Sequence, residues 1–150
     1  MQKFTNSKRA IIGKDKLKAG EKVIITGRAK DDQGDITDAL QMVEQVLGDI
    51  DTCKKEVSGF DDHNGSSICI LGKDNLEKGT CYWDQGYGLY TEKDDRYYLH
   101  GFMGANSLVS EKTCGTKDAK TVYINVLNKM DFIKDNCYLT ERYLTDATVV

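Results

Sequence analysis

Glu21-Lys22-Val23-Ile24-Ile25-Thr26-Gly27 is the stretch that decides the fold class, because β-branched residues fill it and a glycine ends it. This pattern predicts a β-strand. Residues 40–47 predict a second strand, and the turn-forming run Asp31-Asp32-Gln33-Gly34-Asp35 lies between the two. Further outward, strands are predicted over residues 67–72, 86–90, 96–103 and 121–126. The sequence therefore predicts a series of short strands.

Two short helices interrupt this β pattern. Asp49 is a candidate N-cap for a helix whose first turns hold residues 51–55. After the last strand, apolar side chains recur at helical spacing. They are Val126, Met130, Ile133 and Cys137. Short strands followed by one C-terminal helix favour an antiparallel barrel that the helix caps.

The composition excludes several classes of protein. The chain has 150 residues, 39% hydrophobic and 30% charged, with a net charge of −3 and no proline. Such a chain has room for one ordinary domain and is too apolar to be disordered. The acidic balance disfavours nucleic-acid binding. No apolar run approaches the roughly 18 residues of a membrane span, and the opening residues lack the apolar core of a signal peptide.

The cysteines point to an oxidising compartment. There are five, and none belongs to a CxxC pair or lies near His63 or His100 at metal-ligand spacing. A zinc site is therefore disfavoured, and no metal or cofactor is expected. Disulfides need an oxidising compartment, and this expectation conflicts with the lack of a visible signal peptide. One resolution is that the chain is a fragment of a longer secreted precursor.

A series of segments, in order, resembles the second β-barrel of trypsin-like serine proteases, the chymotrypsin family. The segments are residues 19–28, 40–44, 51–55, 67–72, 79–89, 99–104, 113–115, 121–126 and 131–136. The resemblance implies an all-β fold, a six-stranded antiparallel Greek-key barrel with a short intermediate helix and a C-terminal helix. It divides the chain into a lead-in segment (1–18), the barrel with its helix (19–137) and a tail (138–150).

Residues 79–89 lie where the family carries its nucleophile motif, CxGDSGGPL. By this resemblance Gln85 stands at the serine position, and a carboxamide is a very poor nucleophile. Trp83 replaces the glycine that donates an N–H to the oxyanion hole. Asp84 and Gly86 are retained, and Asp84 is expected to be a structural carboxylate that accepts hydrogen bonds from nearby backbone N–H groups. The motif therefore looks degenerate.

The substrate pocket and the catalytic base are altered as well. The resemblance places Gly79 at the pocket floor, where a trypsin-type enzyme carries aspartate, and Gly104-Ala105-Asn106 where the family has Ser-Trp-Gly. The catalytic histidine and aspartate belong to the family's first barrel, which is absent from this sequence. His63 and His100 are expected to be solvated or hydrogen-bonded rather than catalytic.

The resemblance also implies the disulfides. It pairs Cys53 with Cys69 and Cys81 with Cys114, which leaves Cys137. Two interpretations of Cys137 stay open: a buried helix thiol, or a bridge to another chain or to a missing segment.

Two short motifs remain. Asn64-Gly65-Ser66 is a glycosylation sequon, which matters only in a secreted chain. An activation cleavage site is suggested by Arg9-Ala10-Ile11-Ile12-Gly13. We interpret this likeness as superficial, because the segment lies too close to the first strand of the barrel.

The resulting hypothesis is a pseudoprotease, a non-catalytic serine protease homologue that acts by protein binding. Its partner is expected to be another protein chain or a missing first barrel, not a nucleic acid or a membrane, and its location extracellular if it belongs to a longer precursor. One alternative is a truncated or cleaved fragment of a two-barrel protein with no independent activity. A less favoured one is a hydrolase that uses unconventional residues such as Cys81.

Overall fold

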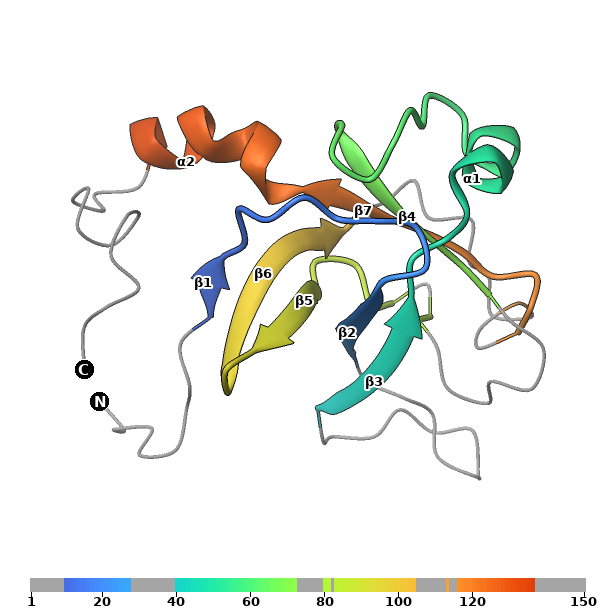
Figure 1. Ribbon diagram of the computed structural model, residues 1–150, viewed down its shortest axis with the longest axis horizontal. Helices are drawn as coiled ribbons and strands as arrows, with labels where there is room; N and C mark the ends of the chain where they lie inside the picture. Colours follow the sequence, from blue (N-terminus) through green and yellow to red (C-terminus); the bar gives the residue numbers. More distant parts are fainter. Residues whose placement is uncertain are drawn as a thin grey trace.

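The protein, a computed structural model, is described over residues 10–27, 40–72, 80–81, 83–104, 113 and 116–136. Figure 1 shows a curled sheet with one helix at each of two corners. Its elements are β1 (Ile11–Ile12), β2 (Lys22–Gly27), β3 (Gln41–Val46), α1 (Ile50–Glu56), β4 (Ser67–Leu71), β5 (Gly88–Lys93), β6 (Arg96–Met103), β7 (Lys120–Asn125), the 3₁₀ helix η1 (Val126–Lys129) and α2 (Met130–Asn136). No helix in these ranges is long and apolar enough to cross a membrane.

Six strands form one antiparallel path in the order β3-β2-β5-β6-β7-β4. A bridge between Leu47 and Ile70 joins the two outer strands, and the Gly48 N–H donates to the Cys69 carbonyl at 3.0 Å. The sheet therefore curls until its outer strands meet. This confirms the expected all-β, six-stranded barrel-type sheet with a short intermediate helix and a C-terminal helix.

The alternation within the strands explains where the core lies. In β2, Val23 and Ile25 are buried whereas Lys22 is exposed, because successive side chains point to opposite faces. The hairpin of β5 and β6 turns at Asp94 and Asp95, which both have positive φ. The main core cluster draws on β2, β4, β5, β6 and β7, and comprises Leu17, Val23, Ile25, Leu47, Ile68, Ile70, Leu89, Met103, Ala119 and Tyr123.

The sequence does not predict β1. Ile11 and Ile12 pair in parallel with Tyr98 and Leu99 of β6. This part of β6 lies beyond the residues that pair with β7, which are Gly101–Met103, so its backbone groups are open to another strand. We call residues 10–18 the lead-in strap. From β1 the blue trace in Figure 1 crosses toward β2, and Leu17 near its end is buried in the core.

The C-terminal helix begins later than the apolar spacing predicts. The Asn125 side chain accepts the Leu127 N–H at 3.0 Å and starts η1, so Val126 is buried in a 3₁₀ turn and the α-helix begins only at Met130. Among its described residues α2 has no buried side chain. Cys137, the last member of the predicted face, lies outside the described residues.

Candidate functional site

The loop that resembles the nucleophile motif is held together by Asp84. Residues 80–88, apart from Tyr82, are described, and we call them the motif loop. The Asp84 carboxylate accepts the Cys81 N–H at 2.8 Å, and the Asp84 N–H donates back to the Cys81 carbonyl at 3.0 Å. The Tyr87 N–H closes the turn on the Asp84 carbonyl at 3.1 Å. Asp84 therefore accepts from a nearby backbone N–H, as expected.

Asp84 is also packed against β2. It is 2% exposed, and a Cβ added to Gly27 at the end of β2 would lie 2.8 Å from its carboxyl carbon. Glycine is therefore needed at position 27 to let the backbone approach a buried charge. Cys81 is buried and disulfide-bonded, which fixes the other side of the loop.

Gln85 lies at the exposed tip of the motif loop. It follows the buried Asp84 and precedes Gly86, whose φ of +86° is a conformation that glycine adopts without strain. The Gly86 N–H donates to Met103 O and the Met103 N–H to Tyr87 O, both at 2.9 Å, so the tip is tied to the end of β6. Trp83 is half-buried beside it. The loop thus presents a carboxamide to solvent from a rigid base.

Tyr123 carries a buried polar group close enough to Asp84 to feel its charge. Its hydroxyl is buried, and within the described part of the chain it has no hydrogen-bond partner. Burial, and then the nearby negative charge of Asp84, raise the pKa of this phenol well above its usual value. Tyr123 is therefore a neutral donor and cannot serve as a base.

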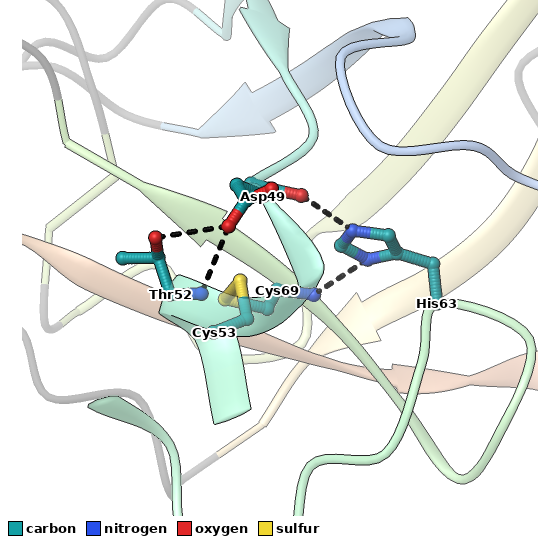
Figure 2. Close-up of a disulfide and its surroundings, with 6 residues drawn as sticks. Asp49, Thr52, Cys53, His63 and Cys69 are labelled. Atoms are coloured by element: carbon teal, nitrogen blue, oxygen red, sulfur yellow. Dashed lines mark hydrogen bonds between the residues drawn. A yellow bond between two sulfur atoms is a disulfide. The ribbon is translucent and has the colours of Figure 1, made fainter. Parts of the chain in front are cut away.

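His63 is buried and committed to the backbone (Figure 2). Its Nδ1 accepts the Cys69 N–H at 3.3 Å, so the proton must be on Nε2, which donates to the Gly48 carbonyl at 2.8 Å. Its ring lies edge-on to Phe60. Burial lowers the pKa of His63, although the Gly48 carbonyl and the charges of Asp62 and Glu21 oppose that shift.

His100 lies in β6. The register places it between Leu99, which pairs with Tyr90, and Gly101, which pairs with Leu89, so it is the extra residue of a β-bulge. Its Nε2 lies 2.9 Å from the Thr91 hydroxyl. Burial lowers its pKa as well, against the charges of Glu21 and Asp15. Both histidines are therefore hydrogen-bonded within the fold, which is one of the two states that the sequence predicts for them.

The Cys53–Cys69 disulfide joins α1 to β4. The helix begins at Asp49, whose carboxylate accepts from the backbone N–H and the hydroxyl of Thr52, both at 3.0 Å, and these bonds lower the pKa of Asp49. Cys53 packs in a small second cluster with Val57, Phe60, Cys69 and Val122. The N-cap predicted at Asp49 is confirmed.

Several residues that the resemblance assigns to the pocket lie outside the part of the chain that the structure describes. Gly79, Ala105, Asn106, Cys114 and Cys137 lie outside the described residues. Gly104 is buried, and its N–H donates to Val122 O at 2.9 Å. Among the described residues no three His, Cys, Asp or Glu side chains gather as metal ligands do. In the described part of the loop, the exposed Gln85 carboxamide can both donate and accept hydrogen bonds.

Residues 10–13 of the segment that looks like an activation site lie in the strap, and Arg9 lies outside the described residues. Ile11 and Ile12 form β1, and Gly13 follows with its N–H on Leu99 O at 2.8 Å. A Cβ on Gly13 would lie 2.3 Å from the His100 ring, so the strap packs directly over that imidazole. This segment therefore contacts β6 by backbone pairing, whereas Asp84 packs against Gly27 at the end of β2.

The sequence singles out Asn64 as a glycosylation candidate but does not predict its structural role. The Asn64 side chain pairs with both backbone groups of Leu17, accepting its N–H at 2.8 Å and donating to its carbonyl at 3.0 Å. The two residues are 47 positions apart, and no local signal in the sequence predicts the pairing.

Comparison with known proteins agrees with this architecture. Residues 3–133 match the family described as "Trypsin". The chain is also 23% identical over 138 residues to haptoglobin of Bos taurus, an alignment that covers 81% of this chain and 33% of that relative. The chain thus spans about a third of the length of the curated relative it matches.

Proposed function

This chain belongs to the trypsin family, and we propose that within this family it is a non-catalytic homologue that acts by binding another protein. The observation that carries the proposal is Gln85. It is exposed at the tip of the motif loop, at the position where the resemblance expects the nucleophilic serine. An amide side chain has no hydroxyl to attack a peptide carbonyl.

The state of the two histidines supports the proposal. A serine nucleophile needs a base within hydrogen-bond reach. This chain has two histidines, and both are buried, with ring nitrogens engaged by Gly48, Cys69 and Thr91. Neither is available to take a proton from the motif loop.

An apolar surface supports binding as the remaining role. Phe102 of β6 and Ile124 of β7 are register partners and lie side by side, 40% and 43% exposed. Leu127 and Phe132 follow in η1 and α2, 37% and 67% exposed. We call these four residues the β6–β7 apolar face. Paired exposed apolar side chains such as Phe102 and Ile124 are typical of protein-interaction sites.

The partner we propose for this face is a second protein domain with an apolar surface, such as a first barrel of the same family. The alignment leaves two thirds of the bovine relative outside the matched region, so that relative holds chain beyond a domain of this kind. The Cys53–Cys69 disulfide supports an extracellular location, where such bonds persist.

A fluorophosphonate probe, which reacts with activated serine hydroxyls, tests the lack of catalysis. We expect no covalent label on the motif loop, while trypsin in the same mixture is labelled fully. Peptide mapping of the product distinguishes the loop from stray reaction elsewhere. Label at the motif loop, or turnover of peptide substrates that is lost in Gln85→Ala, would contradict the proposal.

Co-expression with the first barrel of a trypsin-like protein tests the binding surface. We expect a one-to-one complex by light scattering, and at least a tenfold weaker one for the double variant Phe102→Ser and Ile124→Ser, because hot-spot truncations commonly cost about 2 kcal/mol or more. Met42→Ser is the matched control, since Met42 is 52% exposed on β3, outside the face. Equal loss in both variants would mean that the face is not the docking surface.

A further inference from the structure

The sequon Asn64-Gly65-Ser66 has a role that the proposed function does not use. The Asn64 Oδ1 accepts the Leu17 N–H at 2.8 Å, and the Asn64 Nδ2 donates to the Leu17 carbonyl at 3.0 Å. A backbone N–H needs an acceptor and a carbonyl needs a donor, so the orientation of this carboxamide is determined. We call this two-bond pairing the Asn64 clamp.

The clamp holds the end of the lead-in strap. The strap is fixed at its start by β1 and by the bond from Gly13 to Leu99, and at its end by the buried Leu17 side chain. Leu17 has its backbone N–H and carbonyl satisfied by Asn64. Loss of the clamp leaves both groups of a nearly buried residue without a partner, which disfavours the docked strap.

The loop that carries Asn64 is itself rigid. The Asp62 carboxylate accepts the backbone N–H groups of Asn64 and Gly65, at 2.6 and 2.8 Å. The Asn128 side chain donates to the Gly65 carbonyl, and the Asn125 N–H donates to the Ser66 carbonyl. Asn64 is therefore presented to Leu17 by a loop that cannot easily move away from it.

A glycan and the clamp compete for one position on Nδ2. Two-point pairing to a single residue uses the Nδ2 hydrogen on the same side as Oδ1. An N-glycosidic bond turns the carboxamide into a secondary amide, and such amides strongly prefer the trans form. The trans form places the sugar carbon on the side of Oδ1, where the C–N bond replaces the N–H that donates to Leu17. The 3.0 Å between Nδ2 and that carbonyl leaves no room for a sugar ring.

We infer that the Asn64 clamp and N-glycosylation of Asn64 exclude one another, so that the form with the docked strap carries an unmodified Asn64 and a glycan at this site releases the strap. The inference rests on the geometry of residues 17 and 64 and is independent of whether the protein is catalytic.

Hydrogen exchange on protein made through a secretory pathway tests this. Intact mass separates the glycosylated and unmodified pools, and exchange is followed at the Leu17 and Gly13 amides. We expect both amides to be protected in the unmodified pool and to exchange roughly tenfold or more faster in the glycosylated pool, as the loss of two hydrogen bonds implies.

Two variants make the test independent of how much glycan the host adds. Ser66→Ala removes the sequon and keeps Asn64, so it should match the unmodified pool. Asn64→Ala removes the clamp without adding a sugar, so it should match the glycosylated pool. A glycosylated pool as protected as Ser66→Ala, or an Asn64→Ala variant with unchanged protection, would overturn the inference.

Discussion

At the residue scale, a buried polar side chain such as His63 is held in place by hydrogen bonds to backbone groups. His63 illustrates this, because its loop looks polar in the sequence and yet the ring is fully buried. Each ring nitrogen meets a backbone group of opposite character, at Cys69 and Gly48. The neutral ring therefore acts as a connector between the chain before α1 and the start of β4.

The neutral state of His63 predicts how stability depends on pH. Its pKa is lowered in the folded protein, so the unfolded chain binds the proton more readily near the ordinary histidine pKa of about 6.5. Stability is then full above that pH and falls as the pH drops below it, with a slope of up to about 1.4 kcal/mol per pH unit for one proton. His100, whose pKa is also lowered, contributes with the same sign.

Urea unfolding between pH 7.5 and 5 measures this slope. We expect the free energy of unfolding to decrease on acidification, and the decrease to be smaller in His63→Gln, which does not titrate. His100→Gln should reduce it in the same direction. A wild-type protein that becomes more stable as the pH falls across this window would contradict the neutral state assigned to His63.

Asp84 supports a second prediction at this scale. Asp84→Ala leaves the buried Cys81 N–H without its carboxylate acceptor, and such a loss costs about 1–3 kcal/mol. Asp84→Asn keeps an oxygen at the same place and should lose less. Urea unfolding at neutral pH ranks the two variants. The same stability for both would show that the acceptor at this position is not what the loop needs.

At the scale of elements, the Cys53–Cys69 bridge ties α1 to the barrel. The helix has seven residues, too few to be stable alone, so its position depends on this bond and on the small cluster around Cys53. Replacing both cysteines by alanine should lower the free energy of unfolding by about 2–5 kcal/mol. The control is Lys55→Ala, an exposed residue of the same helix, which should have little effect.

The elements differ in how well the sequence predicts them. β2 and the β5–β6 hairpin were predictable because their alternation and turn residues are local signals. β1 was not, because two residues gain their partner from a strand more than eighty positions away. The apolar spacing predicts a helix that includes Val126, but α2 begins only at Met130. The reason is that the Asn125 side chain accepts the Leu127 N–H and favours a 3₁₀ turn first.

The candidate site shows the same division. The resemblance assigns Gln85 and Asp84 from the order of residues in a contiguous motif, and the structure shows Asp84 buried and Gln85 exposed. The Asn64 clamp and the burial of His63 depend on backbone groups of distant segments, which no spacing within the chain reveals.

At the scale of the whole molecule, Gly48 is where the closure of the sheet, the disulfide and His63 meet. Its N–H bonds to Cys69, its carbonyl accepts from His63, and a Cβ there would lie 2.5 Å from the Cys53 sulfur. Gly48→Ala should therefore destabilise the protein by about 1–3 kcal/mol through overpacking. Gly65→Ala is the control, since its Cβ would make an ordinary contact at 3.5 Å. Similar losses in both would refute the special role of Gly48.

Restoring the hydroxyl of the motif loop should not by itself restore catalysis in this molecule. Gln85→Ser returns a hydroxyl to the tip of the motif loop, but an unactivated hydroxyl needs a base to become a nucleophile. Both histidines of the chain hold buried structural hydrogen bonds, and the buried Tyr123 phenol stays protonated. We therefore expect Gln85→Ser alone to show no peptide hydrolysis and no fluorophosphonate labelling above wild type.

Adding a first barrel that supplies a histidine and an aspartate is the decisive comparison, because weak labelling only in that mixture would place the missing base outside this chain. Labelling of Gln85→Ser by itself would show that a base within the chain reaches the loop, which the positions of His63 and His100 do not allow.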